Sequence, residues 1–147
     1  MFEDEVFSRS IKDSVEKLFI SCAADLTIYS VSILAAQNRE LVDHLDGKAT
    51  ELYREALVHG LKDHKTQDDL EVHAEAFSIR AQSVTWETAF QDPKIFSKSI
   101  GDLIRFAPVV EEFKDLDREI VTNSIRFRWR DIRDQAQRRL KIEKFNW

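Results

Sequence analysis

Residues 108–147 read PVVEEFKDLDREIVTNSIRFRWRDIRDQAQRRLKIEKFNW, and no glycine or second proline interrupts this stretch. Proline fits the first helical position, so Pro108 marks a helix start. The apolar side chains that follow recur mostly at three- and four-residue spacing, which is typical of one helix face. They are Phe113, Leu116, Ile120, Val121, Ile125, Trp129, Ile132, Ala136 and Leu140. The pattern predicts a long C-terminal helix over 108–147, with its apolar stripe buried in the domain or against a second chain.

The length of this helix limits how it can pack. A straight helix over 108–145 would span about 57 Å, whereas a compact domain of this size is only about 40 Å across. The helix must therefore project from the domain or break. The weak helix formers Thr122, Asn123 and Ser124 favour a kink near Asn123. Residues 125–130 also alternate apolar with basic, as an edge strand would, so a strand is the rival interpretation there.

The end of this stretch is strongly basic. Residues 126–147 contain eight Lys and Arg against three acids, a net charge of +5 on a chain of net −5, so residues 1–125 carry −10. Such asymmetry favours binding to a polyanion or to an acidic protein surface. The candidate binding residues are Arg126, Arg128, Arg130, Arg133, Arg138 and Arg139.

The rest of the chain predicts further helices. Three Gly and two Pro in 147 residues are too few for the turns of an all-β fold. Apolar spacing indicates helices over 7–22, 26–45, 52–57, 70–84 and 96–107, with a break at Gly47, an end at Gly60 and a stop at Asp92-Pro93. Residues 27–33 also alternate with period two and could form a strand that pairs with 125–130. We expect one all-α domain over 1–147, an irregular bundle of five to six helices.

The segment Leu18–Ala36 is almost uncharged, with Asp25 as its single charged residue. It is long enough to cross a bilayer, but a central Asp would cost about 2.5–3.5 kcal/mol on insertion. We therefore expect a buried core helix and no membrane contact. The single Cys22 and the acidic N-terminus, which does not resemble a secretory signal, predict a cytoplasmic protein.

Signatures of metal or cofactor chemistry are not found. The histidines are His44, His59, His64 and His73, and none lies in a Glu-x-x-His or HExxH pattern. The sequence also lacks a CxxC pair and a glycine-rich phosphate loop. We expect no metal site and no cofactor.

One short motif points to an enzyme. The run Arg54-Glu-Ala-Leu-Val-His59-Gly60 resembles the Arg-x4-6-His motif of the HEPN family, which includes ribonucleases. The resemblance covers seven residues, and Glu55 stands where that family commonly has another polar residue. It implies that Arg54 would hold a phosphate and His59 would move a proton, without metal, at a dimer interface. The alternative is that Glu51, Glu55 and His59 form an ordinary column on a helix surface.

Together these patterns predict a non-catalytic regulatory or interaction module. It would act through its C-terminal helix, as a homodimer or with a protein partner. The alternatives are a HEPN-like ribonuclease that uses Arg54 and His59, and a nucleic-acid-binding module that uses the C-terminal arginines.

Overall fold

The computed structural model describes residues 2–38, 40, 43–63, 65–106, 130–135 and 138. Within these residues the chain is helical and contains no strand, which confirms the all-α class. The elements are α1 (Phe2–Gln37), α2 (Leu45–Leu61), α3 (Gln67–Gln82), the short 3-10 helix η2 (Ala89–Gln91) and α4 (Ser97–Phe106). The strand interpretation of 27–33 is wrong, because these residues lie inside α1. Residues 125–129 lie outside the described part of the chain.

Helix α1 joins two segments that the sequence analysis separated. It runs unbroken for 36 residues, about 54 Å, because neither Gly nor Pro interrupts it. It ends at Gln37 instead of continuing to Leu45. The expected break at Gly47 is also wrong, since Gly47 lies in the first turn of α2. The connection is made earlier, where Asn38 accepts the Glu40 N–H at 3.2 Å and His44 adopts a left-handed backbone with φ of 68°.

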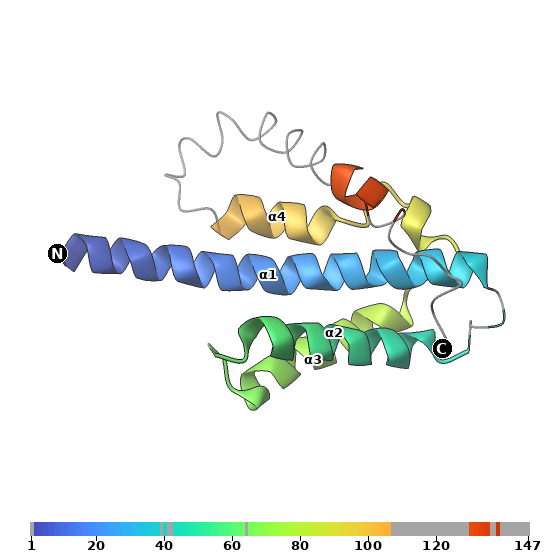
Figure 1. Cartoon of the computed structure of the whole chain (residues 1–147), viewed down its shortest axis with the longest axis horizontal. Coiled ribbons are helices and arrows are strands. Elements are labelled where there is room, and N and C mark those ends of the chain that lie inside the picture. The colour runs from blue at the N-terminus through green and yellow to red at the C-terminus, as the bar shows by residue number, and fades with distance from the viewer. Residues whose placement is uncertain are drawn as a thin grey trace.

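Helix α1 is the central element of the described structure (Figure 1). Helix α4 lies along one side of α1, and α2 and α3 lie along the other. Helix α2 has 17 residues and α4 has 10, so both are much shorter than α1. The N-terminal turns of α1 therefore extend past the ends of the other labelled helices, as Figure 1 shows.

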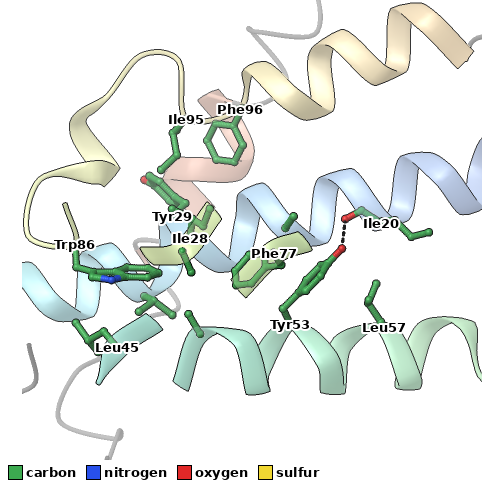
Figure 2. Close-up of a cluster of buried hydrophobic side chains, with 14 of the residues drawn as sticks. Ile20, Ile28, Tyr29, Leu45, Tyr53, Leu57, Phe77, Trp86, Ile95 and Phe96 are labelled. Atoms are coloured by element: carbon green, nitrogen blue, oxygen red, sulfur yellow. Dashed lines mark hydrogen bonds between the residues drawn. The ribbon is translucent and has the colours of Figure 1, made fainter. Parts of the chain in front are cut away.

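The core is built from aromatic and aliphatic side chains around the C-terminal half of α1 (Figure 2). The Tyr53 ring stacks on Phe77 with 4.4 Å between centroids, which joins α2 to α3. Tyr29 packs against Phe96 at 5.4 Å and joins α1 to the start of α4. The Tyr53 hydroxyl donates to the Ile20 carbonyl at 3.2 Å. Burial raises the pKa of Tyr53 well above its ordinary value, so the phenol keeps the proton that it donates.

Helix α3 begins as the polar loop predicts and ends earlier than expected. Thr66 and Asp69 form a reciprocal capping box at its N-terminus. The helix stops at Gln82, ten residues before the predicted stop at Asp92-Pro93. Ser32 of α1 explains the difference, because its hydroxyl donates to the Trp86 carbonyl at 2.6 Å and accepts from the Phe90 N–H at 2.7 Å. These bonds hold the segment after α3 in turns against α1.

Most of the predicted C-terminal helix over 108–147, including the kink near Asn123, lies outside the described residues. Residues 130–135 are helical. The Arg133 guanidinium lies 5.7 Å from the Phe96 ring centroid, so this short piece contacts the start of α4. Ile132, predicted to be buried in the domain or against a second chain, is 40% exposed in the single chain. The other residues of this predicted apolar stripe, including Leu116, Ile120, Ile125 and Trp129, lie outside the described residues.

Candidate functional sites

A buried ion pair joins α1, α3 and α4. Asp25 is fully buried, and its Oδ1 lies 2.7 Å from Nη1 of Arg80. Its Oδ2 accepts the backbone N–H of Ser99 at 2.8 Å. The carboxylate–guanidinium contact has the distance of an ion pair but not the angle of a good hydrogen bond. Charge attraction therefore holds Arg80 against the core, while 30% of its side chain stays exposed.

Further polar contacts surround this pair on the side of α4. The Ser21 hydroxyl donates to Oδ2 of Asp102. Cys22 lies on the next position of α1, and burial together with the charges of Asp25 and Asp102 raises the pKa of its thiol to about 11. A thiol with such a pKa is almost wholly protonated near neutral pH. Cys22 is therefore a poor nucleophile in this state.

The structure places Arg54 and His59 on α2, where both line one open depression of about 670 Å³. Arg54 is already engaged, because its Nε and Nη2 donate to the two carboxylate oxygens of Glu71 at 2.9 and 2.7 Å. The Glu71 hydrogen bond raises the pKa of Arg54. A phosphate at this guanidinium would have to displace Glu71 from α3. His59 is exposed on the last turn of α2.

Among the C-terminal binding candidates, the structure describes three. Arg130 and Arg138 are exposed, and Arg133 is partly covered by its contact with Phe96. Arg126, Arg128 and Arg139 lie outside the described residues. In the described ranges, no three His, Cys, Asp or Glu side chains gather closely enough to hold a metal ion.

An apolar groove of about 400 Å³ separates α1 from α2 on the surface. Its walls include Phe19, Leu26, Leu52 and Ala56, and Cys22 also lines this space. Phe19 is 37% exposed and Leu52 is 39% exposed. Phe19 also packs on α2 so closely that a Cβ on Gly60 would collide with its ring.

The groove continues into an exposed apolar stripe on the N-terminal half of α1. We call Ile11, Val15, Leu18, Phe19 and Cys22 the α1 stripe. Ile11 and Val15 are 38% and 58% exposed, and Leu18 and Cys22 are half-buried. Ile11, Val15, Leu18 and Cys22 are separated by four, three and four positions, a spacing that places them on one helix face. The N-terminal turns of α1 extend past α2 and α4 (Figure 1), whereas Phe19 lies against Gly60 of α2.

Within the described residues, α1 is the one helix long and apolar enough to cross a membrane by length and composition. A core helix passes the same test. In the most apolar stretch of α1, 61% of the residues are buried inside the structure.

Sequence reasoning noticed Asp25 as an isolated charge but missed its partner. Arg80 is 55 positions away, and helical spacing cannot pair residues on different helices. The structural roles of Ser32 and Gly60 were missed for the same reason. A lone acid in an apolar helix was nevertheless a usable signal, because a buried charge must find a partner.

No protein-family model matches the chain, and no curated protein or solved structure matches it significantly.

Proposed function

We propose that this protein is a non-catalytic interaction module that pairs with a second copy of itself through the α1 stripe. The observation that carries the proposal is a row of apolar side chains, of which Ile11, Val15 and Phe19 are exposed, on a helix that extends past its neighbours. Large contiguous apolar patches on a protein surface often mark interaction sites, whereas single exposed apolar residues are common and need no explanation. The spacing of Ile11, Val15, Leu18 and Cys22 suits packing against another helix.

Charge supports a second copy as the occupant. Two copies of a chain with net charge −5 repel each other in general. Residues 5–17 are balanced, with three acids and three bases, so this stretch can meet its own copy without a net penalty. The acids are Glu5, Asp13 and Glu16, and the bases are Arg9, Lys12 and Lys17.

The C-terminal segment 108–147, which the sequence predicts to be helical, is proposed as a second contact. Its basic end, with a net charge of +5, is complementary to the acidic remainder of a neighbouring copy, which carries −10. The exposed Arg130 and Arg138 belong to this end.

The test is the mass of the full chain in solution at high salt, which screens the basic contact, measured by light scattering over a range of concentrations. Val15→Glu should give a monomer, because a carboxylate at the centre of the stripe would be desolvated in the dimer. Val72→Glu is the matched control, since Val72 is 65% exposed on α3 and lies outside the stripe. A parent chain that stays monomeric, or equal effects of both variants, would refute the proposal.

A HEPN-like ribonuclease is the second candidate, because Arg54 and His59 share one depression. Cleavage of single-stranded RNA in the presence of EDTA tests it. Arg54→Ala and His59→Ala should each abolish cleavage if this candidate is correct. Activity that persists in both variants would come from a contaminant.

A further inference from the structure

A polar hollow of about 350 Å³ lies where α3 ends and the chain turns towards α4. It shares no lining residue with the α1–α2 groove. Buried Ile28 and Ile95, with half-buried Val84, supply apolar surface. Its polar lining is Arg80, Ser83, Thr85, Thr88, Asp92 and Lys94. The volume suits a small molecule, because ligand pockets range upward from about 300 Å³.

The guanidinium of Arg80 is held in place at the hollow before any ligand arrives, and Asp25 offsets its charge. The Asp25 carboxylate holds Nη1 of Arg80 at 2.7 Å, and Nη2 of Arg80 donates to the Ile95 carbonyl at 3.5 Å. A guanidinium has five N–H donors, so these contacts leave donor capacity for a ligand. Because the side chain is already held in place, a bound anion would not have to supply the cost of ordering it.

The other polar groups add a second cation and hydroxyl donors. Lys94 is exposed at the hollow, as are Thr85 and Thr88. Asp92 is the opposing charge in the lining, but its Oδ1 already accepts the backbone N–H of Lys94 at 2.8 Å. The Asp92 carboxylate therefore stabilises the local turn. Its negative charge weakens the attraction of the hollow for an anion, but the donors of Arg80, Lys94 and the threonines stay available.

We propose that this hollow is a binding site for a small anion, a phosphate or carboxylate group carried on an apolar body. Arg80 and Lys94 contact the anionic group, the threonine hydroxyls donate to it, and Ile28, Val84 and Ile95 cover the apolar part. A guanidinium beside an ammonium and hydroxyl donors is the usual protein environment of such groups.

The experiment is an NMR titration of the full-length protein with inorganic phosphate, phenyl phosphate and benzoate. We expect amide resonances of residues 83–95 to shift, with a dissociation constant on the order of 1 mM or tighter for phenyl phosphate or benzoate. Whichever of these two binds more tightly identifies the anionic group. Weaker binding of inorganic phosphate than of phenyl phosphate would show that the apolar surface contributes.

Three variants separate a built site from general surface attraction. Lys94→Gln should weaken binding about fivefold, and Asp92→Asn should strengthen it about twofold, which is the scale of exposed charge pairs. Asn keeps the acceptor that the Lys94 N–H needs. Lys98→Gln is the control, since Lys98 is exposed on α4 and does not line the hollow; it should change nothing.

The role of Arg80 needs a variant that still folds. Arg80→Gln alone would leave Asp25 buried without its cation, so we combine it with Asp25→Asn. The double variant should fold and lose binding. Unmoved resonances of 83–95 with all three probes, equal weakening by Lys94→Gln and Lys98→Gln, or full binding by a folded double variant would each overturn the proposal. If the double variant does not fold, the Lys94 and Asp92 variants decide.

Discussion

Asp25 shows how one residue can shape a helical fold. It is the single charge of a long apolar stretch, and it binds both Arg80 of α3 and the first turns of α4 through Ser99. Asp25→Ala leaves Arg80 without its counter-ion and the Ser99 N–H without its acceptor. Breaking a buried ion pair costs about 3–5 kcal/mol. We expect a loss near the lower end, because 30% of the Arg80 side chain is exposed and can be rehydrated.

Urea unfolding measures this loss directly. Asp25→Asn is the informative comparison, because it keeps an oxygen for Ser99 while removing the charge. It should be less destabilising than Asp25→Ala. Equal stability of Asp25→Ala and the parent chain would contradict the ion pair.

The glycines offer a second test at this scale. Gly101 lies in α4 and has nothing within 4 Å of an added Cβ. Gly101→Ala should therefore stabilise the protein by up to about 1 kcal/mol, the usual helical preference for Ala. A Cβ on Gly60 would instead collide with the Phe19 ring. Gly60→Ala must displace that ring from α2. We therefore expect it to lack the stabilisation expected for Gly101→Ala and to lower the midpoint of thermal unfolding.

Cys22 gives a chemical test of the environment of the α1 stripe. Because burial and two nearby acids raise its pKa to about 11, only a small fraction is thiolate at neutral pH. Alkylation by iodoacetamide should be slow at pH 7 and should accelerate about tenfold per pH unit well below pH 11. A rate that reaches its plateau near pH 8.5 would contradict the raised pKa.

At the scale of elements, the start of α3 carries a measurable cap. The Thr66 hydroxyl and Asp69 carboxylate satisfy each other's backbone donors. Thr66→Ala should cost about 1 kcal/mol. The Thr66 side chain and backbone lower the pKa of Asp69 from 3.8. Asp69 therefore stabilises the fold above pH 3.8, and this contribution is lost as the pH falls through its lowered pKa.

This pH dependence can be measured by comparing unfolding at pH 6 and pH 3. The difference in stability between the parent chain and Thr66→Ala should shrink at the lower pH. A difference that stays constant would show that the carboxylate does not take part in the cap.

Helix existence was predictable from the sequence, but the connections were less so. Spacing of three and four residues identified the apolar faces of α1 to α4, because each helix must bury one face. It failed at Gly47, where a helix tolerates Gly in its first turn, and after Gln82, where Ser32 of another helix bonds Trp86 and Phe90 and holds this segment in turns. Such contacts join residues more than 50 positions apart, so no local pattern contains them.

The candidate sites were predictable to a smaller extent. The pattern of residues 7–22 placed Ile11, Val15, Leu18 and Cys22 on one face. It could not show that this face stays exposed, because exposure depends on where the shorter helices end. The pairing of Arg54 with Glu71 and the hollow beside Arg80 arise from packing between helices, which the sequence does not specify.

For the whole molecule, the two proposed contacts differ in their response to salt. Association through the α1 stripe is driven by apolar burial, which salt does not weaken. Association through the basic C-terminal segment is electrostatic, and ions at about 0.15 M screen charges separated by more than about 8 Å. Mass measurements from low to high salt therefore distinguish the two contacts. We expect a dimer that persists at high salt and dissociates in Val15→Glu.

The variant with Arg126, Arg130 and Arg133 changed to Glu completes the test. It should keep the salt-resistant dimer and lose only assemblies larger than the dimer that form at low salt. A dimer lost in this variant and preserved in Val15→Glu would assign pairing to the C-terminal segment instead. The same variant serves as the control for nucleic-acid binding. If the protein binds duplex DNA, its binding constant should fall with salt concentration, with a log–log slope of roughly −0.9 per neutralised phosphate. If the parent chain binds DNA or RNA tightly and this variant does not, the basic segment is a nucleic-acid interface. A segment that only contacts a second copy of the chain would not need to bind a polyanion.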